Sequence, residues 1–315
     1  MHANTRNKSL VALLRCTQTT SQGEVCGGTL NLKGDTWTCC LCDRQYQQVQ
    51  GVPVLKAETF EPYDTWLEQI YSGRDRTLDL ANDYLRSERE LMGHFVREQN
   101  LHGPCLEIGC GTGLFAEIVP EFIGLDYSLN LLLARGFEPF TRVCGDARQI
   151  PLVDASVECI FSFNTLEHVP DLDLAFSEMD RVLKPAGFMV LKPAWHCTRY
   201  QTELIPILPY QQLNMRQKLT KALLPILTSK PYKFLTKVPY RLWRRITYRK
   251  NNSLSWRKLT PYHGKLWIAD ADATASIDSH EAILYYQSRR YQCLSHLGVF
   301  RQLLAGHDIV ILRKP

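Results

Sequence analysis

Three glycines alternate with other residues in the segment 109–113, directly after an apolar run that ends at Ile108. Glycine adopts positive φ without strain and lets a ligand approach the backbone, and the first amides of a following helix can bind an anionic group. A second short apolar run ends in Asp126, 17 residues beyond Gly109. An acid at that position of a β-α-β unit can accept hydrogen bonds from both hydroxyls of a ribose. The spacing therefore predicts a site for a nucleoside-containing ligand.

The glycine spacing argues against a dinucleotide. The dinucleotide fingerprint requires Gly or Ala three residues after its second glycine, whereas position 114 is Leu. With Glu107 ahead of it, the GxGxG run resembles that of the class I S-adenosylmethionine (SAM)-dependent methyltransferases, in particular the type 11 group. Two later segments, 145–171 and 179–195, resemble the same family in the same order along the chain. The resemblance implies a Rossmann-like methyltransferase fold and methyl transfer from SAM.

The same resemblance implies a role for individual residues. The methionine end of SAM is assigned to Glu107 and the glycine backbone, the ribose to Asp126, and the adenine edge to Asp146 with Ala147. Asn164, at the end of the fourth predicted strand, would close the pocket under the methionine moiety. The alternative for Asp146 is that it caps a turn. The full set of cofactor-binding residues expected from the resemblance is Glu107, Gly109, Gly111, Gly113, Asp126, Tyr127, Asp146, Ala147 and Asn164.

Two histidines are candidates for a catalytic base. Transfer of a methyl group from a sulfonium is an in-line displacement, so the enzyme mainly orients the reactants and excludes water. A base is needed only for an acceptor such as a hydroxyl or a protonated amine. His168 follows the fourth predicted strand and could instead shape its loop, whereas His196 follows the fifth and is expected to face the acceptor.

The Glu-His pair at 167–168 also resembles part of a metal site in some ubiquinone-pathway O-methyltransferases. In that pattern an upstream Glu completes the site, and here Asn164 stands in its place. This departure argues against a metal at His168.

The N-terminal segment carries cysteines at metal-ligand spacing. Cys39 and Cys42 form a CxxC knuckle, which is a half-site for tetrahedral zinc. The segment resembles the Trm112-like zinc ribbon that precedes many type 11 methyltransferases, which implies a structural zinc ion on Cys16, Cys26, Cys39 and Cys42. The first knuckle departs from the pattern because nine residues separate Cys16 from Cys26. Either a loop bulges between two real ligands, or Cys16 has lost its partner and the module is a metal-free remnant held by apolar residues.

Alternating strand and helix patterns must position these residues. Continuous apolar runs predict buried strands, and apolar residues at helical spacing predict helices between them. Strands separated by helices give an α/β fold with a doubly wound, mostly parallel sheet, to which the resemblance adds a C-terminal antiparallel hairpin. The predicted strands are 104–109, 122–126, 140–144, 157–163, 187–192, 292–299 and 307–313, and the predicted helices are 84–98, 114–119, 128–135, 171–183 and 279–290.

We expect five consecutive regions in the 315 residues. A small zinc-ribbon-like cysteine module precedes a connector, and the SAM-binding core is interrupted by a basic helical insert before its last elements. The expected boundaries are 1–56 for the cysteine module, 57–82 for the connector, 83–199 for the methyltransferase core, 200–275 for the insert or lid, and 276–315 for the C-terminal helix and hairpin.

The insert is the most unusual part of the sequence. Between Ile205 and Ala269 it has 14 Lys and Arg and no Asp or Glu, so the rest of the chain is acidic although the net charge is +5. In 215–250 apolar and aromatic residues are interleaved with cations, which is typical of an amphipathic helix pair. Such a pair could be a lid over the acceptor site, could also contact an anionic membrane or a lipid-linked acceptor, or could hold RNA through phosphates and stacking.

Composition and cysteine usage point to the cytoplasm. The 11 cysteines occur without an export signal, and no apolar run is long enough to span a membrane. The leading hypothesis is a SAM-dependent methyltransferase, cytoplasmic or peripheral at the membrane, that modifies a small-molecule or lipid-linked acceptor, including sugar-containing ones, at oxygen. The alternatives are an rRNA or tRNA methyltransferase and a non-catalytic SAM-binding scaffold.

Overall fold

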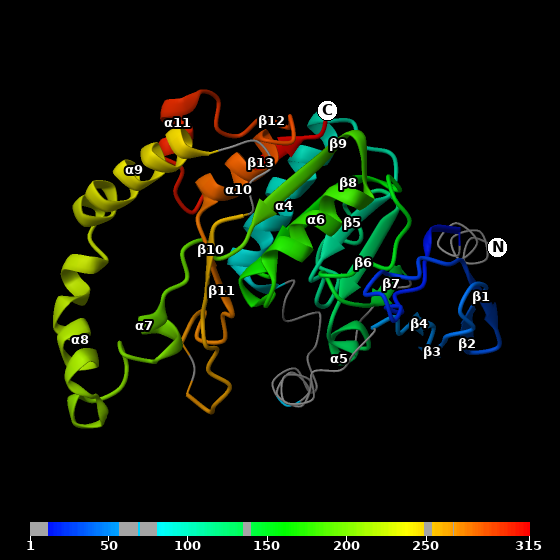
Figure 1. The fold of residues 1–315 in the computed structure, drawn as a ribbon, viewed down its shortest axis with the longest axis horizontal. Helices are drawn as coiled ribbons and strands as arrows, with labels where there is room; N and C mark the ends of the chain where they lie inside the picture. Colours follow the sequence, from blue (N-terminus) through cyan, green and yellow to red (C-terminus); the bar gives the residue numbers. More distant parts are fainter. Residues whose placement is uncertain (1–11, 57–68, 70–80, 135–139, 249–253, 267) are drawn as a thin grey trace. The chain divides into compact units, whose positions relative to one another are not determined.

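The computed structural model describes residues 12–56, 69, 81–134, 140–248, 254–266 and 268–315, and its elements are drawn in Figure 1. These residues form two compact units. Unit 1 comprises the described residues of Met1–Ser162 and Leu174–Phe188, and unit 2 comprises those of Phe163–Asp173 and Met189–Pro315. Nearly all of the predicted connector 57–82 lies outside the described residues.

The central sheet confirms the predicted α/β fold. Its seven strands are hydrogen-bonded in the order β12-β13-β9-β8-β5-β6-β7. β5 pairs in parallel with β6 and β8, and β6 pairs in parallel with β7, whereas β12 and β13 are antiparallel. β5 and β6 are buried along their whole length, which explains why most of their residues are apolar. The strands are β5 Cys105–Ile108, β6 Phe122–Asp126, β7 Thr141–Cys144, β8 Val157–Phe163, β9 Leu183–Lys192, β12 Gln292–Cys293 and β13 Val310–Arg313.

The helices of the core begin and end near their predicted bounds. α4 spans Asp83–Glu98, and the Asn82 side chain caps it by accepting from the N–H groups of Tyr84 and Leu85. Its buried side includes Met92 and Phe95. α5 covers Leu129–Leu132 and α6 covers Leu172–Val182. The C-terminal run predicted as strand over 292–299 is shorter than expected, since β12 has two residues and α11, Val299–Leu303, starts before the run ends.

The helix predicted at 114–119 is absent. The chain forms successive turns there, in which the Ala116 N–H donates to the Gly113 carbonyl at 3.2 Å and the Ile118 N–H donates to the Phe115 carbonyl at 3.0 Å. These i→i+3 bonds are tighter than those of an α-helix. Gly113 itself has φ of +73°, which is incompatible with helical backbone. The glycines therefore lead into turns rather than into the expected helix N-terminus.

The cysteine module is a small antiparallel sheet of β1 Leu30–Lys33, β2 Thr36–Cys39, β3 Gln45–Val49 and β4 Val52–Pro53. It is joined to the central strands of the same unit, because Val54 forms a parallel bridge with Cys144 and the Leu55 N–H donates to the Cys144 carbonyl at 2.8 Å. Arg15 adds an ion pair to Glu178 at 3.2 Å. The module is thus hydrogen-bonded to the edge strand β7.

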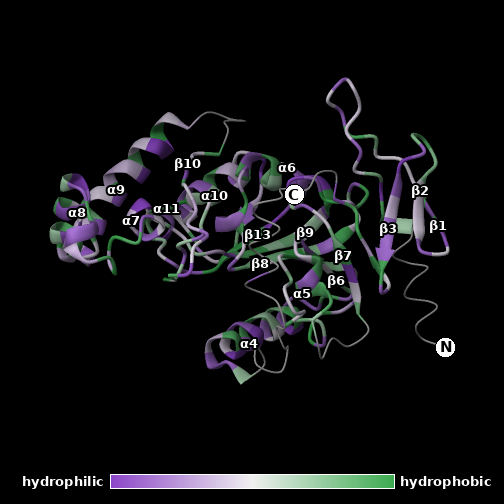
Figure 2. Cartoon of the chain, turned by 90° about the horizontal axis from the view of Figure 1, so that it is seen from below, coloured by the Kyte–Doolittle hydropathy of each residue, from purple (hydrophilic) through white to green (hydrophobic). Residues whose placement is uncertain are grey.

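The insert forms the expected helix pair in unit 2, with α8 at Met215–Leu227 and α9 at Lys230–Thr247. Figure 2 shows hydrophobic and hydrophilic residues mixed along both helices. Among the residues that the structure describes, no helix is long and apolar enough to cross a membrane. The other elements of unit 2 are the 3-10 turns η1 Leu166–His168 and η2 Tyr210–Gln212, the helices α7 Arg199–Thr202 and α10 Ser279–Gln287, and the strands β10 Trp256–Lys258 and β11 Ala275–Ile277.

Candidate active site

The glycine turn and Asp126 are joined directly in unit 1. Gly109, Gly111 and Gly113 all have positive φ, between 51° and 73°. The Gly111 N–H donates to Oδ2 of Asp126 at 2.8 Å, and the Ser128 N–H donates to its Oδ1 at 2.8 Å. Burial raises the pKa of the Asp126 carboxyl, although these N–H groups oppose the shift. The carboxylate is therefore held in one orientation at the end of β6.

Glu107 lies beside this carboxyl with an unsatisfied oxygen. The residue is 2% exposed at the end of β5, and its Oε2 has no hydrogen-bond partner among the described residues. Burial raises the pKa of Glu107 well above its ordinary value, and the charges of Asp126 and Glu88 raise it further. A buried acid that lacks a partner is costly, so this arrangement favours a ligand that brings a positive charge.

The other predicted residues of unit 1 lie on the loops that follow β6 and β7. Asp146 and Ala147 form a turn in which the Asp146 carboxylate accepts from the Arg148 backbone N–H at 2.8 Å and from its guanidinium at 2.6 to 3.0 Å. Asp146 therefore caps a turn, as the alternative interpretation proposed, and its carboxylate is already paired. Tyr127 lies next to Asp126 and receives the Lys56 ammonium over its ring at 4.2 Å from the centroid.

His168 and Asn164 belong to unit 2. Asn164 is exposed, adopts φ of +49°, and donates its N–H to the Lys192 carbonyl at 3.0 Å. His168 lies among acids, with its Nδ1 at 3.3 Å from Asp272 Oδ2 and its Nε2 at 3.7 Å from Glu167 Oε1. Burial lowers the pKa of His168, but the charges of Glu167 and Asp272 outweigh burial and raise it. The two acids favour the protonated, positively charged form of His168, which would hold the loop together through ion pairs.

His196 has the opposite environment. It follows β9 with φ of +68°, and its Nε2 is buried without a partner among the described residues. Its Nδ1 lies 3.7 Å from Oδ2 of Asp278, and the His307 ring packs edge-on against it at 5.4 Å. Burial lowers the pKa of His196 to about 3, and the nearby Lys237 and Arg241 add to the shift. The imidazole is therefore neutral near pH 7, and no described residue forms a hydrogen bond with its buried Nε2.

His196 lines a cavity of about 700 Å³ that lies within unit 2. One side of the cavity is a face of α9, and β10 and the segment after β9 form further walls. The lining residues include Lys233, Lys237, Tyr232, Tyr240, Trp256, Arg257, Asp270, Asp278 and His307. His168 is not among the residues that line this cavity, so the structure separates the two histidines that the sequence left equivalent.

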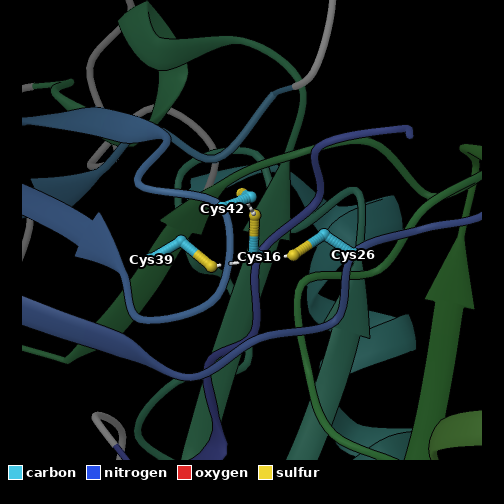
Figure 3. A group of neighbouring side chains, drawn as sticks. All are labelled: Cys16, Cys26, Cys39 and Cys42. Carbon is cyan, nitrogen blue, oxygen red and sulfur yellow. Dashed lines mark hydrogen bonds between the residues drawn. The ribbon is translucent and has the colours of Figure 1, made fainter. Parts of the chain in front are cut away.

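The four predicted zinc ligands converge in unit 1. The sulfur atoms of Cys16, Cys26, Cys39 and Cys42 all lie within 4.8 Å of one another, and Figure 3 shows the four thiols pointing towards a common centre. Within the described residues, they are the only group of His, Cys, Asp and Glu side chains with the geometry to hold a metal ion. Four convergent thiols match the donor set of a tetrahedral structural zinc site.

The long spacing between Cys16 and Cys26 is explained by a bulging loop. Thr19 and Val25 form an antiparallel bridge, and Gly23 turns the chain with φ of +82°. The Cys26 N–H then donates to the Gln18 carbonyl at 2.8 Å, which returns the chain to Cys16. The nine intervening residues thus form a small hairpin, and both cysteines reach the cluster.

Sequence reasoning did not identify the cationic side chains near either site. Lys56 was grouped with the cysteine module, yet its ammonium lies over the Tyr127 ring. Its charge opposes the rise in the pKa of Asp126 that burial causes. Lys233 and Lys237 were part of the basic insert with no individual role. Their spacing of four residues places them on one face of a helix, but only the tertiary structure shows that this face lines a cavity.

Comparison with known proteins supports the sequence resemblance over the core. A family model described as a methyltransferase domain matches residues 106–191. The chain is 38% identical over 113 residues to a probable SAM-dependent methyltransferase of Mycolicibacterium smegmatis, covering 32% of this chain and 44% of the relative. It is 33% identical over 102 residues to a malonyl-[acyl-carrier protein] O-methyltransferase of a Methylovorus species, covering 27% of this chain and 34% of the relative.

A third relative is a demethylmenaquinone methyltransferase of Staphylococcus aureus, 36% identical over 97 residues and covering 27% of this chain and 40% of the relative. The chain thus spans half or less of the length of the curated relatives it matches.

Two solved structures align with parts of this chain. One is a complex of the Haloferax volcanii Trm112 methyltransferase activator with a methyltransferase, at 11% identity and a TM-score of 0.43, covering 80% of this chain and 97% of the other. The second is a SAM-bound amino pentose methyltransferase of Micromonospora echinaspora, at 23% identity and a TM-score of 0.32, covering 44% and 58% of the two chains. Both TM-scores lie below 0.5, which is too low to assign function or assembly by similarity.

Proposed function

The chain carries a methyltransferase domain of the SAM-dependent class, and from that premise we propose that the protein transfers a methyl group from SAM to a small-molecule or lipid-linked acceptor at oxygen. The observation that carries the proposal is the buried pair Glu107 and Asp126 beside the glycine turn. Both carboxyls have a raised pKa, and Glu107 has an unsatisfied oxygen. SAM fits this environment because it brings an ammonium group, a sulfonium and a ribose.

Each residue of this pair has a task in the proposal. Glu107 would accept from the ammonium of the methionine end, and Asp126 would exchange its bond to Gly111 for the ribose hydroxyls. When bound, SAM supplies an activated methyl group. The turn at Gly111 leaves room for the ligand, because a Cβ at this position would meet nothing within 4 Å. The Asp146 carboxylate is already paired with Arg148. The adenine would therefore contact the backbone of the turn at Asp146 and Ala147 instead of this carboxylate.

His196 is the residue we assign as the base. Its neutral imidazole presents an unpartnered Nε2 in the cavity of unit 2, and Asp278 faces its other nitrogen. A hydroxyl acceptor bound in this cavity could donate a hydrogen bond to Nε2. His168 is instead proposed to position its loop, because its two nitrogens face acids and its pKa is raised.

The insert favours a lipid-linked acceptor over RNA. Arg241, Arg244 and Arg245 are held within unit 2, since Arg241 pairs with Asp278 at 2.7 Å, Arg244 pairs with Glu281 at 2.8 Å and Arg245 donates to Gln302 at 2.8 Å. These cations are unavailable to nucleic-acid phosphates. The exposed side of the helix pair is apolar, with Leu235, Trp243 and Ile246 exposed by 69%, 56% and 76%. An exposed apolar helix surface suits the interface of a membrane.

The remaining predicted arrangement is also a proposal. We propose that Cys16, Cys26, Cys39 and Cys42 hold a structural zinc ion that stabilises the module docked on β7. The five regions 1–56, 57–82, 83–199, 200–275 and 276–315 remain our proposal for the domain organisation.

The decisive experiment combines SAM binding with acceptor discovery. Calorimetry should detect SAM binding to the full chain, and Asp126→Asn should weaken it at least tenfold, whereas the exposed Asp35→Asn should not. Extract fractions containing lipids, RNA or small molecules are then incubated with labelled SAM and the enzyme. We expect the label to appear in the lipid or small-molecule fraction. His196→Gln should incorporate less label into that fraction. Label in RNA alone would replace the acceptor proposal, and absence of SAM binding would revive the scaffold alternative.

A further inference from the structure

The cavity of unit 2 has an excess of positive charge that internal ion pairs do not remove. Lys233 and Lys237 from α9 and Arg257 from β10 line it. Within the described part of the chain, none of the three forms an ion pair with a carboxylate. The cavity is therefore cationic where the helix face of α9 meets β10.

The acids in the same wall are already engaged. Asp278 accepts from Arg241 through both oxygens, at 2.7 and 3.1 Å, and Glu281 accepts from Arg244 through both oxygens at 2.8 Å. Asp270 is the remaining acid, and it accepts from the Gln201 amide at 3.2 Å. Three cations of the lining therefore face one acid, Asp270, that is not in an ion pair with Lys or Arg, so positive charge exceeds negative charge in the cavity.

Lys237 is the most constrained of these cations. Its side chain is half-buried, and burial together with Arg241, Lys233 and Arg257 lowers the pKa of Lys237 to about 8, opposed by Asp278. An ammonium that is partly desolvated among like charges gains more from an added anion than an exposed one does.

Aromatic side chains in the walls of the cavity indicate the chemistry of the rest of the ligand. Tyr232 and Tyr240 lie on the face of α9 that lines the cavity, and Trp256 of β10 also lines it. The Trp256 indole is fixed because its Nε1–H donates to Asp173 Oδ2 at 2.8 Å. Apolar rings beside a group of cations suit an organic molecule that ends in an anion, and His196 lies in the same cavity.

Building on the proposed function, we propose that this cavity binds the methyl acceptor through a phosphate group, held by Lys233, Lys237 and Arg257. A phosphate dianion can accept from all three cations at once, whereas a carboxylate has half its charge and one oxygen fewer. The phosphate can belong to a lipid headgroup or to a soluble phosphate ester. The phosphate anchors the acceptor, and the aromatic walls and His196 contact its organic part.

The test uses the full chain and two probes. Inorganic phosphate is titrated calorimetrically into the wild type and into Lys237→Met, Arg257→Met and Lys230→Met. Lys230 lies on α9 but is exposed and does not line the cavity, so Lys230→Met removes the same charge as a matched control. Because charged hydrogen bonds contribute about 1.5–3 kcal/mol, loss of Lys237 or Arg257 should weaken phosphate binding by about tenfold or more, and Lys230→Met should not.

Vesicles distinguish the two sources of phosphate. Binding to phosphatidylcholine vesicles that contain phosphatidic acid, weakened by Lys237→Met and competed by inorganic phosphate, indicates a lipid headgroup. Phosphate binding without such vesicle binding indicates a soluble ester. Equal losses in Lys237→Met and Lys230→Met, or no binding of either probe, would overturn the inference. SAM binding is measured on the same samples and on folded variants checked by thermal melting, so failure of the phosphate site is separable from failure of the methyltransferase proposal.

Discussion

The backbone N–H of Gly111 donates to Oδ2 of Asp126 across 2.8 Å, which links the glycine turn to the acid at the end of the neighbouring strand. Parallel pairing of β5 with β6 brings the two segments together, since Ile108 lies opposite Leu125 in the register. The bond fixes the carboxylate that we propose as the partner of the ribose of SAM. Two motifs that are separate in the sequence therefore form one structural unit.

This turn predicts unequal effects of two similar substitutions. A Cβ on Gly111 would meet nothing within 4 Å, so Gly111→Ala carries only the strain of φ +51°, about 1 kcal/mol of unfolding free energy. A Cβ on Gly113 would overlap the Phe140 ring, which packs edge-on against Phe122 at 5.0 Å. Gly113→Ala should cost about 1–3 kcal/mol more. Denaturant unfolding of both variants measures the difference, and equal losses would contradict this packing.

Glu107 should couple SAM binding to proton release. Its raised pKa favours the protonated form in the free protein, and an ammonium beside it would lower that pKa, so a proton leaves on binding. Calorimetry in buffers of different ionisation enthalpy, repeated over a range of pH, should show this proton release. Glu107→Gln should abolish it and weaken SAM binding by about 1.5–3 kcal/mol. The exposed Glu90→Gln is the control, and unchanged proton release in Glu107→Gln would refute the assignment.

The buried His196 should destabilise the protein in acid. Its pKa of about 3 lies below the unfolded value of 6.5, so its contribution to stability is complete above pH 6.5 and is lost as the pH falls towards 3. Between pH 6.5 and pH 3, protonation of this histidine in the unfolded state lowers the unfolding free energy by about 1.4 kcal/mol for each unit by which the pH falls. His196→Gln should have a shallower decline between pH 6 and pH 4.5 in denaturant unfolding. Identical slopes in the two proteins would show that His196 is not buried as a neutral group.

The cysteine cluster predicts stoichiometric zinc. Metal analysis of protein purified without chelators should find about one zinc ion per chain, bound by four thiolates. Cys39→Ser should lose the metal and lower the melting temperature, because the module docks on β7 through Leu55 and Cys144. Cys40→Ser is the matched control, since Cys40 is exposed and is not one of the four converging cysteines. Metal-free wild-type protein with an unchanged melting temperature in Cys39→Ser would identify a metal-free module.

The exposed face of α9 should contact anionic membranes. Trp243 and Ile246 are exposed by 56% and 76%, and burying such a side chain in lipid contributes about 1.5–3 kcal/mol. Trp243→Ala and Ile246→Ala should each reduce cosedimentation with anionic vesicles at least severalfold. Leu41→Ala removes a side chain of unit 1 that is exposed by 73% and should have no effect. Equal vesicle binding by all four proteins would rule out this surface.

Much of the fold was predictable because its signals are local. The apolar run at 157–163 became β8 with the same bounds, and the pattern over 84–98 became α4 with one residue added. The helix predicted at 114–119 was wrong because Gly113 adopts positive φ and the N–H groups of Ala116 and Ile118 bond three residues back, which forms turns. The local sequence of a strand or helix with a clear period predicts it, whereas the turn at Gly113 also depends on packing against Phe140, which lies 27 residues further along the chain.

The sequence by itself determined the chemistry available to the protein: glycines that can take positive φ, acids at strand ends, and a CxxC knuckle that can bind zinc. These depend on residue type and short spacing. Only the tertiary structure decided that Cys26 reaches Cys16, that His196 rather than His168 lines a cavity, and that Arg241 and Arg244 are paired while Lys237 is not. Burial and ion pairing between segments distant in the chain set these properties, and no local pattern encodes them.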